Sequence, residues 1–232
     1  MRTIYLNCEN GVSGDMVLNA LADLCEDPDA VRGEIHRISH AIGEKTQHDH
    51  HHEYAHSHTH EHFHRSYHDV TAIIDSVPAG ADVKAVAQQI YTVIAKAESA
   101  VHGDPLDELH FHEVGRDQAI ANVLGVAVCM DALKADTVLV SEVCDGQGTV
   151  KCAHGILHVP VPAVKAMLDD CDLAYRQTEY EGERVTPSGL AMLIGIGAVT
   201  GSKPEGTPVC ASEAFGGRAA GGHGLIAELY MD

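Results

Sequence analysis

The residues with the clearest chemistry in this sequence are the histidines between His48 and His64. Nine of the seventeen residues in this segment are histidines, namely His48, His50, His51, His52, His56, His58, His60, His62 and His64. Neutral imidazole binds nickel, copper, zinc and cobalt, so a dense run of histidines offers many interchangeable ligand sets. We predict that the segment collects divalent metal ions. The alternative is an expression tag or a polar linker, although the internal position argues against a tag.

A second group of metal-ligating and proton-accepting side chains lies further along the chain. Glu98 and His102 are four residues apart in a predicted helix and therefore share one face of it. His110 and His112 alternate in an extended segment, which puts them on one side, and Glu113 follows. We predict a metal-binding or proton-transfer site here. The alternative is that Glu98 is a solvated charge and one histidine is a hydrogen-bonded core residue.

A third candidate pairs a thiol with an imidazole. Cys152 and His154 are two residues apart and follow the bend Gly146-Gln147-Gly148. These glycines do not match the dinucleotide-binding fingerprint, and the sequence contains neither a Gly-x-Ser-x-Gly nucleophile elbow nor a Walker A motif. We therefore predict that His154 is a further metal ligand and assign no phosphate-binding loop.

Composition excludes several classes of protein. Acidic residues outnumber lysine and arginine by 34 to 15, which gives a net charge of -19 and makes nucleic acid and bare membrane surfaces poor partners. The sequence has no apolar run of the roughly 18 residues that a membrane span needs. Seven scattered cysteines without a Cys-x-x-Cys pair, and a start unlike a signal peptide, lead us to expect reduced thiols and a cytoplasmic location.

The elements that must position these side chains alternate between strands and helices. Hydrophobic periodicity and capping signals predict strands over 2–8, 137–143 and 224–231, and helices beginning after Ser13, over 82–101, over 119–133, and after Val161 and Thr186. This alternation predicts an α/β fold in a single domain, 1–232, with a disordered His-rich insertion at 45–64.

Several motifs, read in order, resemble one family. They are Tyr5-Leu6-Asn7-Cys8 with Gly11-Val12-Ser13-Gly14-Asp15-Met16, His64-Arg65-Ser66-Tyr67, Ala97-Glu98 with Val101-His102-Gly103, Leu109-His110-Phe111-His112-Glu113-Val114-Gly115, Gly148 to Cys152 with His154-Gly155, Val159-Pro160-Val161-Pro162-Ala163, and Val185-Thr186-Pro187-Ser188-Gly189. Together they resemble the LarC-type nickel insertion proteins, over residues 4 to about 190.

The resemblance implies an intracellular reaction on the nickel-pincer cofactor of lactate racemase-type enzymes. Nickel replaces a proton on a carbon of pyridinium bisthiocarboxylate mononucleotide. CTP, bound together with Mg²⁺ or Mn²⁺ at a separate C-terminal part, is consumed in the reaction. The resemblance implies catalytic roles for Asp15, His110, His112 and Glu113. Metal binding is expected at Glu98, His102, His154 and the His-rich segment, and a racemase-type apoenzyme is the expected recipient.

The chain departs from the family pattern at three positions. Asn7, Gln118 and Asn122 stand where the family usually has carboxylates, which keeps shape but removes negative charge and proton-accepting ability. The alternative function is therefore a non-catalytic nickel store or metallochaperone. An orphan hydrolase with an incidental His loop is disfavoured because no nucleophile motif is present.

Overall fold

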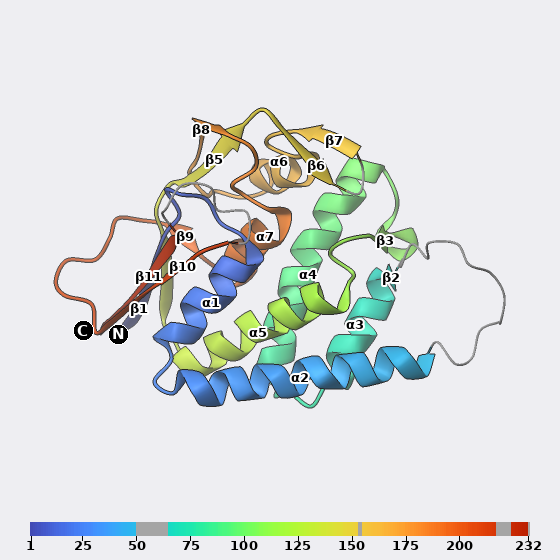
Figure 1. Ribbon diagram of the computed structural model, residues 1–232, viewed down its shortest axis with the longest axis horizontal. Helices are drawn as coiled ribbons and strands as arrows, with labels where there is room; N and C mark the ends of the chain where they lie inside the picture. The colour runs from blue at the N-terminus through green and yellow to red at the C-terminus, as the bar shows by residue number, and fades with distance from the viewer. Residues whose placement is uncertain (50–64, 153–154, 217–223, 232) are drawn as a thin grey trace.

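A mixed β-sheet forms one side of the molecule (Figure 1). The computed structural model describes residues 1–49, 65–152, 155–216 and 224–231. The strand order is β10 (Cys210–Ala214), β11 (Leu225–Met231), β1 (Arg2–Asn7), β4 (Thr137–Val140) and β9 (Val199–Thr200). β1, β4 and β9 are parallel, whereas β11 is antiparallel to both of its neighbours. With the helices described below, this confirms the predicted α/β class.

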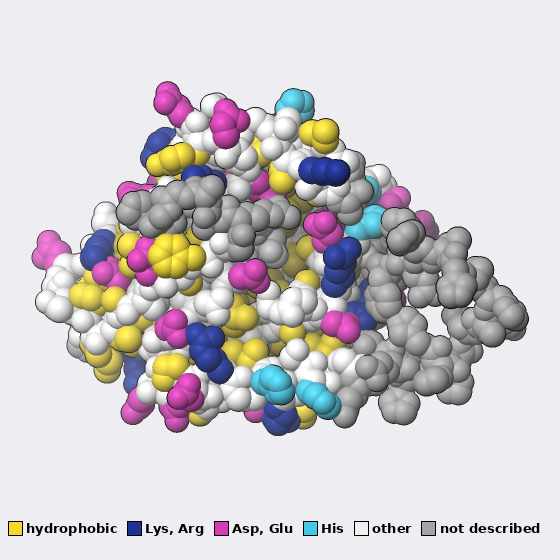
Figure 2. Space-filling view, in the orientation of Figure 1, with side chains coloured by type: hydrophobic (Ala, Val, Ile, Leu, Met, Phe, Trp, Pro, Cys, Tyr) yellow, Lys and Arg dark blue, Asp and Glu magenta, His cyan; other side chains and the backbone are white. Residues whose placement is uncertain are grey.

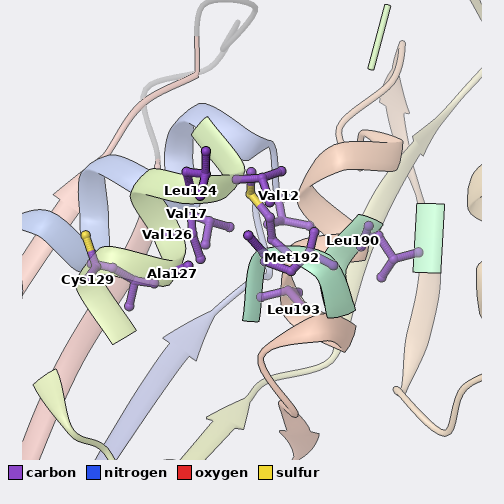
Figure 3. Close-up of a cluster of buried hydrophobic side chains, with 14 of the residues drawn as sticks. Val12, Val17, Leu124, Val126, Ala127, Cys129, Leu190, Met192 and Leu193 are labelled. Carbon is purple, nitrogen blue, oxygen red and sulfur yellow. The ribbon is translucent and has the colours of Figure 1, made fainter. Parts of the chain in front are cut away.

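Three helices build the hydrophobic core beside the sheet. α1 (Gly14–Leu24) begins at Ser13, whose hydroxyl accepts the Met16 N–H as predicted, and it packs on β10 and β11. α5 (Asp117–Leu133) is buried on most sides, and α7 (Pro187–Gly195) begins at Thr186. Side chains of these helices pack together with that of Val12, which precedes α1 (Figure 3). The cluster includes Val17, Leu124, Val126, Leu190, Met192 and Leu193. None of the described helices is both long and apolar enough to cross a membrane.

The long helix α4 (Ala81–His102) carries two predicted site residues to one end of the molecule. Its buried stripe includes Val83, Ala87, Ile90 and Ile94, as the helical spacing predicted. The helix ends at Gly103, which adopts a left-handed conformation with φ of 77°. Because glycine takes this conformation without steric cost, it stops the helix directly after His102.

Two helices on either side of the His-rich segment were not predicted. α2 (Pro28–Asp49) packs on α5, and its backbone is helical to Asp49, so it overlaps the predicted insertion at 45–64 over residues 45–49. The outer face of α2 is strongly polar and its buried stripe is narrow, so the segment has too few apolar residues to show a clear helical pattern. α3 (Tyr67–Ser76) begins at a capping box between Ser66 and Asp69. Residues 50–64, with eight of the nine predicted histidine ligands, lie outside the described residues.

The predicted strand over 137–143 is divided into two. β4 ends at Val140, and β5 (Val143–Gln147) joins a different sheet with β8 (Tyr175–Glu181). The division occurs at Ser141, whose hydroxyl accepts the Cys8 N–H at 2.8 Å and whose own N–H donates to Leu6 at 3.0 Å. A hairpin, β6 (Thr149–Cys152) with β7 (Gly155–His158), and α6 (Pro162–Asp169) complete this part of the fold.

Candidate functional site

A cavity of about 790 Å³ brings together five of the predicted catalytic and metal-binding residues, Asp15, Glu98, His102, His112 and Glu113. Its volume lies within the range of about 300–1,000 Å³ that small-molecule sites occupy. The first turn of α1, the last turns of α4, the segment after Phe111, and the starts of α6 and α7 contribute to its wall. The described polar lining residues are Asn10, Ser13, Asp15, Glu98, His102, His112, Glu113, Cys152, Glu181, Glu183, Arg184, Thr186 and Ser188.

The starts of α1 and α7 are joined by backbone hydrogen bonds. The Val12 N–H donates to Arg184 and the Thr186 N–H donates to Val12, both at 2.9 Å. Gly189 allows this close approach, since a Cβ there would lie 2.6 Å from the Val12 carbonyl oxygen. The glycine of the Thr-Pro-Ser-Gly motif therefore serves to bring two helix N-termini to one side of the cavity.

Asp145 fixes the same wall from behind. It is fully buried, and its Oδ1 accepts the backbone N–H groups of Gly146, Arg184 and Val185 at 2.7, 2.8 and 2.9 Å. The Tyr175 hydroxyl donates to its other oxygen at 3.3 Å. Burial, followed by the charge of Asp145, raises the pKa of Tyr175 above its ordinary value. Sequence reasoning missed Asp145, because a single aspartate in a strand carries no distinguishing pattern.

Asp15 is connected by hydrogen bonds to Asn122 and, through it, to Gln118, two of the amides that are expected to depart from the family pattern. Asn122 Nδ2 donates to Asp15 Oδ1 at 2.6 Å, and Gln118 Nε2 donates to Asn122 Oδ1 at 2.8 Å. This chain of hydrogen bonds connects α5 to the cavity wall on α1. The third amide, Asn7, is not among the residues that line the cavity. Its side-chain oxygen accepts the Glu9 N–H at 3.0 Å.

The predicted helical pair Glu98 and His102 forms the opposite wall. His102 Nε2 lies 3.3 Å from Glu98 Oε2, and the two side chains are 31% and 18% exposed. The rings of His102 and His112 have their centroids 6.4 Å apart at an angle of 43°. Both histidines also line a smaller depression of about 450 Å³, together with Asp104 and His110. His110 and His112 therefore share one side, as predicted, but only His112 reaches the large cavity.

The turn that carries His112 and Glu113 is held by buried polar contacts. Arg65 is 6% exposed, donates to the Gly115 carbonyl at 2.8 Å and forms an ion pair with Asp117 at 2.5 Å. The Tyr91 hydroxyl donates to the Val114 carbonyl at 2.9 Å. The two-stranded sheet of β2 (Arg65–Ser66) and β3 (His110–Phe111) pairs Arg65 with Phe111. The first described residues after the His-rich segment thus lie beside the wall that carries His112.

The cavity is strongly acidic. Its described lining includes five carboxylates, from Asp15, Glu98, Glu113, Glu181 and Glu183, against a single guanidinium, that of Arg184. Arg184 also stacks on Tyr180, with its guanidinium carbon 4.0 Å from the ring centroid. Carboxylates gathered in a concave surface favour the entry of cations. The two histidines add nitrogen ligands that suit late transition metals.

The described residues contain no group of three or more His, Cys, Asp or Glu side chains already arranged to hold a metal ion. His102, His112 and Glu98 are neighbours without forming a closed coordination site. Cys152 lines the cavity, whereas His154 lies outside the described residues, as do 50–64. The side chain of His48 is also not described.

The family model described as "Nickel insertion protein" matches residues 4–224 of this chain. The chain belongs to the nickel insertion protein family. Three relatives bear the name pyridinium-3,5-bisthiocarboxylic acid mononucleotide nickel insertion protein. The protein from Alkaliphilus metalliredigens is 37% identical over 83% of this chain, that from Acetivibrio thermocellus 33% over 89%, and that from Lactiplantibacillus plantarum 34% over 100%.

The alignment covers only part of each of these three relatives. The aligned region spans 52%, 54% and 62% of those three proteins, so this chain corresponds to little more than half of their length. No solved structure is significantly similar to the chain.

Proposed function

We propose that this chain takes part in the insertion of nickel into pyridinium bisthiocarboxylate mononucleotide, the nickel-pincer cofactor of lactate racemase-type enzymes. The observation that carries the proposal is the single cavity on which Asp15, Glu98, His102, His112 and Glu113 converge from distant parts of the chain. Its volume suits a mononucleotide, and its wall combines nitrogen ligands with carboxylates. The names of the relatives support the same substrate.

The reaction requires a group that presents nickel and a group that accepts a proton. A carbon–nickel bond forms as the pyridinium carbon gives up its proton, so a base must lie beside the metal. We assign His102 and His112, assisted by Glu98, to the nickel ion that is the substrate. His102 is oriented by Glu98 at 3.3 Å, which fixes the ring for binding through its other nitrogen.

Asp15 and Glu113 are the proposed proton acceptors. The NH₂ group of Asn122 donates to Asp15 Oδ1 at 2.6 Å and so orients this carboxylate. Asn122 is then a positioning residue that sets the orientation of the base. Glu113 is exposed and lies on the turn held by Arg65 and Tyr91.

The smaller depression provides a proposed route for nickel from the His-rich segment. It is lined by His102, Asp104, His110 and His112, and two of these histidines also line the large cavity. Its edge is β3, which pairs with β2 directly after the segment ends. In this scheme the nine histidines collect nickel, His110 receives it, and His102 with His112 pass it inward. Cys152 also lines the large cavity, and His154 is proposed as a further nickel ligand.

We propose that the complete reaction is a CTP-dependent nickel chelatase reaction of the lyase class in the cytoplasm. The nucleotide with its Mg²⁺ or Mn²⁺ would bind a separate C-terminal part. The product would pass to a racemase-type apoenzyme. A nickel store or metallochaperone is the second candidate, favoured by the nine histidines between His48 and His64.

A reconstitution assay separates these two functions. The chain is mixed with Ni²⁺, the mononucleotide, CTP, Mg²⁺ and the C-terminal part of a relative, and the nickel-bound cofactor is quantified by mass spectrometry. Insertion predicts product in the parent chain and its loss in His102→Asn, with His158→Asn, an exposed histidine on β7, as the matched control. Binding of nickel without product above the protein-free blank would support the storage function and reject insertion.

A further inference from the structure

We infer that His36 and His40 on α2 form a second metal-binding site, selective for a divalent late first-row transition metal and separate from the cavity. The two histidines are four residues apart within the helix α2, so they are neighbours on one face. Both are exposed. Figure 2 shows two histidine side chains gathered on the surface over α2.

The buried face of α2 determines that these two side chains point to solvent. Ile38 and Ile42 are 1% and 0% exposed, and α2 packs on α5. Each residue in a helix turns by about 100°, so His36 and His40 lie about 200° from Ile38 and Ile42 respectively. A hydrophobic role for the two imidazoles is therefore excluded, and the pair forms a stripe on the outer surface.

Helical spacing of four residues is suited to chelation of one ion by two imidazoles. Their Cβ atoms are about 5–6 Å apart at this spacing, which lets both rings reach a common metal, as in helical metal sites that use two histidines four residues apart. Nickel, copper, zinc and cobalt accept imidazole readily, and water completes the coordination at an exposed site. Hard cations such as Mg²⁺ prefer oxygen ligands and are excluded.

The charged groups next to the pair do not oppose a bound cation, because both arginines have acidic or carbonyl partners. Arg32, one turn before His36, lies 2.6 Å from Asp23 and 3.3 Å from Asn19 of α1. Arg37 pairs with Glu34 and donates to the Pro78 carbonyl at 2.5 Å. Both guanidinium groups are thus held by contacts away from the histidine stripe.

The pair lies on the helix that precedes the His-rich segment in the chain. α2 is the helix that leads into this segment, and β2 is the strand that follows it. The cavity depression lies beside β2, whereas His36 and His40 lie on α2. The chain would therefore have a metal site on α2, before the His-rich segment, in addition to the proposed site after it.

Nickel titration of a chain without the nine histidines of the segment tests the inference. These nine are replaced by asparagine in the full-length chain, and Ni²⁺ binding is followed by calorimetry. We expect His36→Asn or His40→Asn to weaken one site on the order of 100-fold, the usual advantage of two linked ligands over one. His102→Asn should leave this site unchanged and affect only the cavity.

Two controls keep the result specific. The double variant His36→Asn with Ser39→His retains two histidines on α2 but places them side by side, so it should bind nickel as weakly as His36→Asn alone. Paramagnetic Ni²⁺ at substoichiometric amounts should broaden the ring signals of His36 and His40 before those of His68 and His158. Unchanged binding in His36→Asn and His40→Asn, or full binding by the spacing variant, would overturn the inference without affecting the cavity proposal.

Discussion

The two walls of the large cavity are built in different ways. The wall formed by the starts of α1 and α7 is fixed by backbone hydrogen bonds between Val12, Arg184 and Thr186 and by the buried carboxylate of Asp145. The wall that carries Glu98, His102 and His112 consists of partly exposed side chains, in which His102 Nε2 lies 3.3 Å from Glu98 Oε2 and the rings of His102 and His112 are 6.4 Å apart. The first wall is thus built from backbone contacts, and the second from side chains.

This difference suits a site that handles an organic molecule and a metal ion in one reaction. A mononucleotide benefits from a preformed surface, because ordering a loose surface on binding costs conformational entropy. A metal that must be received and then released benefits from ligands that are not locked into a closed coordination shell.

Removal of the Asp145 side chain should cause the largest loss of stability. Asp145→Ala leaves three backbone N–H groups without their acceptor, the buried ones of Gly146 and Val185 and the part-buried one of Arg184. Each unsatisfied buried group costs about 1–3 kcal/mol, so we expect the free energy of unfolding to fall by several kcal/mol. Urea denaturation measures it. Asp145→Asn retains one acceptor oxygen and should cost clearly less; equal losses would show that these hydrogen bonds do not fix the wall.

Crowding the contact between α1 and α7 should have the next largest effect. In Gly189→Ala the new methyl group would lie 2.6 Å from the Val12 carbonyl oxygen, so the two helix starts must separate. Overpacking of this kind costs about 1–3 kcal/mol. Gly33→Ala on α2 is the control, because no atom lies within 4 Å of its added methyl group. It should raise stability by up to about 1 kcal/mol, the difference in helix propensity. Thermal denaturation compares the two variants.

Asn122 tests the contact between the fixed wall and the metal, because its amide donates to Asp15 on that wall. Asn122→Asp replaces the donor to Asp15 by a second carboxylate at 2.6 Å, so it should lower the melting temperature in the presence of a chelator. Added Ni²⁺ should reverse this loss, because two adjacent carboxylates favour a bound cation. Asn7→Asp is the matched control, since its oxygen accepts the Glu9 N–H in either form. Equal responses of both variants to nickel would show that Asn122 lies outside the metal site.

Thiol reactivity gives the smallest effect and compares the interior with the cavity. Burial raises the pKa of Cys8 to about 12, so its thiolate is scarce at pH 8.5 and its reaction with iodoacetamide should be very slow. Cys152 is half-buried and lines the cavity, and it should be alkylated first of the two. Peptide mapping after brief alkylation measures both. Rapid labelling of Cys8 would mean that the region behind the fixed wall opens readily.

Sequence patterns predicted the parts of the fold that have strong local signals. The helix over α4, its end at Gly103, the caps at Ser13 and Thr186 and the strands β1 and β11 follow from apolar spacing and capping chemistry. α2 was missed because its polar outer face hides its narrow buried stripe. The division between β4 and β5 was missed because it depends on a hydrogen bond from Cys8 to Ser141, which are 133 residues apart in the chain.

Local spacing predicted which candidate side chains are neighbours, but not how distant segments of the chain come together. The spacing of Glu98 and His102 and the alternation of His110 and His112 gave correct neighbours. Asp15 reaches the same cavity only through the packing of α1 against α5 and α7, which local patterns do not encode. Asp145 and Arg65 support the site from buried positions and carry no sequence signature of their own.

The central claim is that nickel and the mononucleotide meet in the cavity lined by Asp15, His102 and His112. Crystals of the chain grown with Ni²⁺ and the mononucleotide, with diffraction recorded on both sides of the nickel absorption edge, test it most directly. The account predicts an anomalous peak in the cavity within bonding distance of His102 or His112, with the mononucleotide beside it. Nickel peaks confined to α2 or the His-rich segment, with the mononucleotide bound elsewhere, would contradict the account.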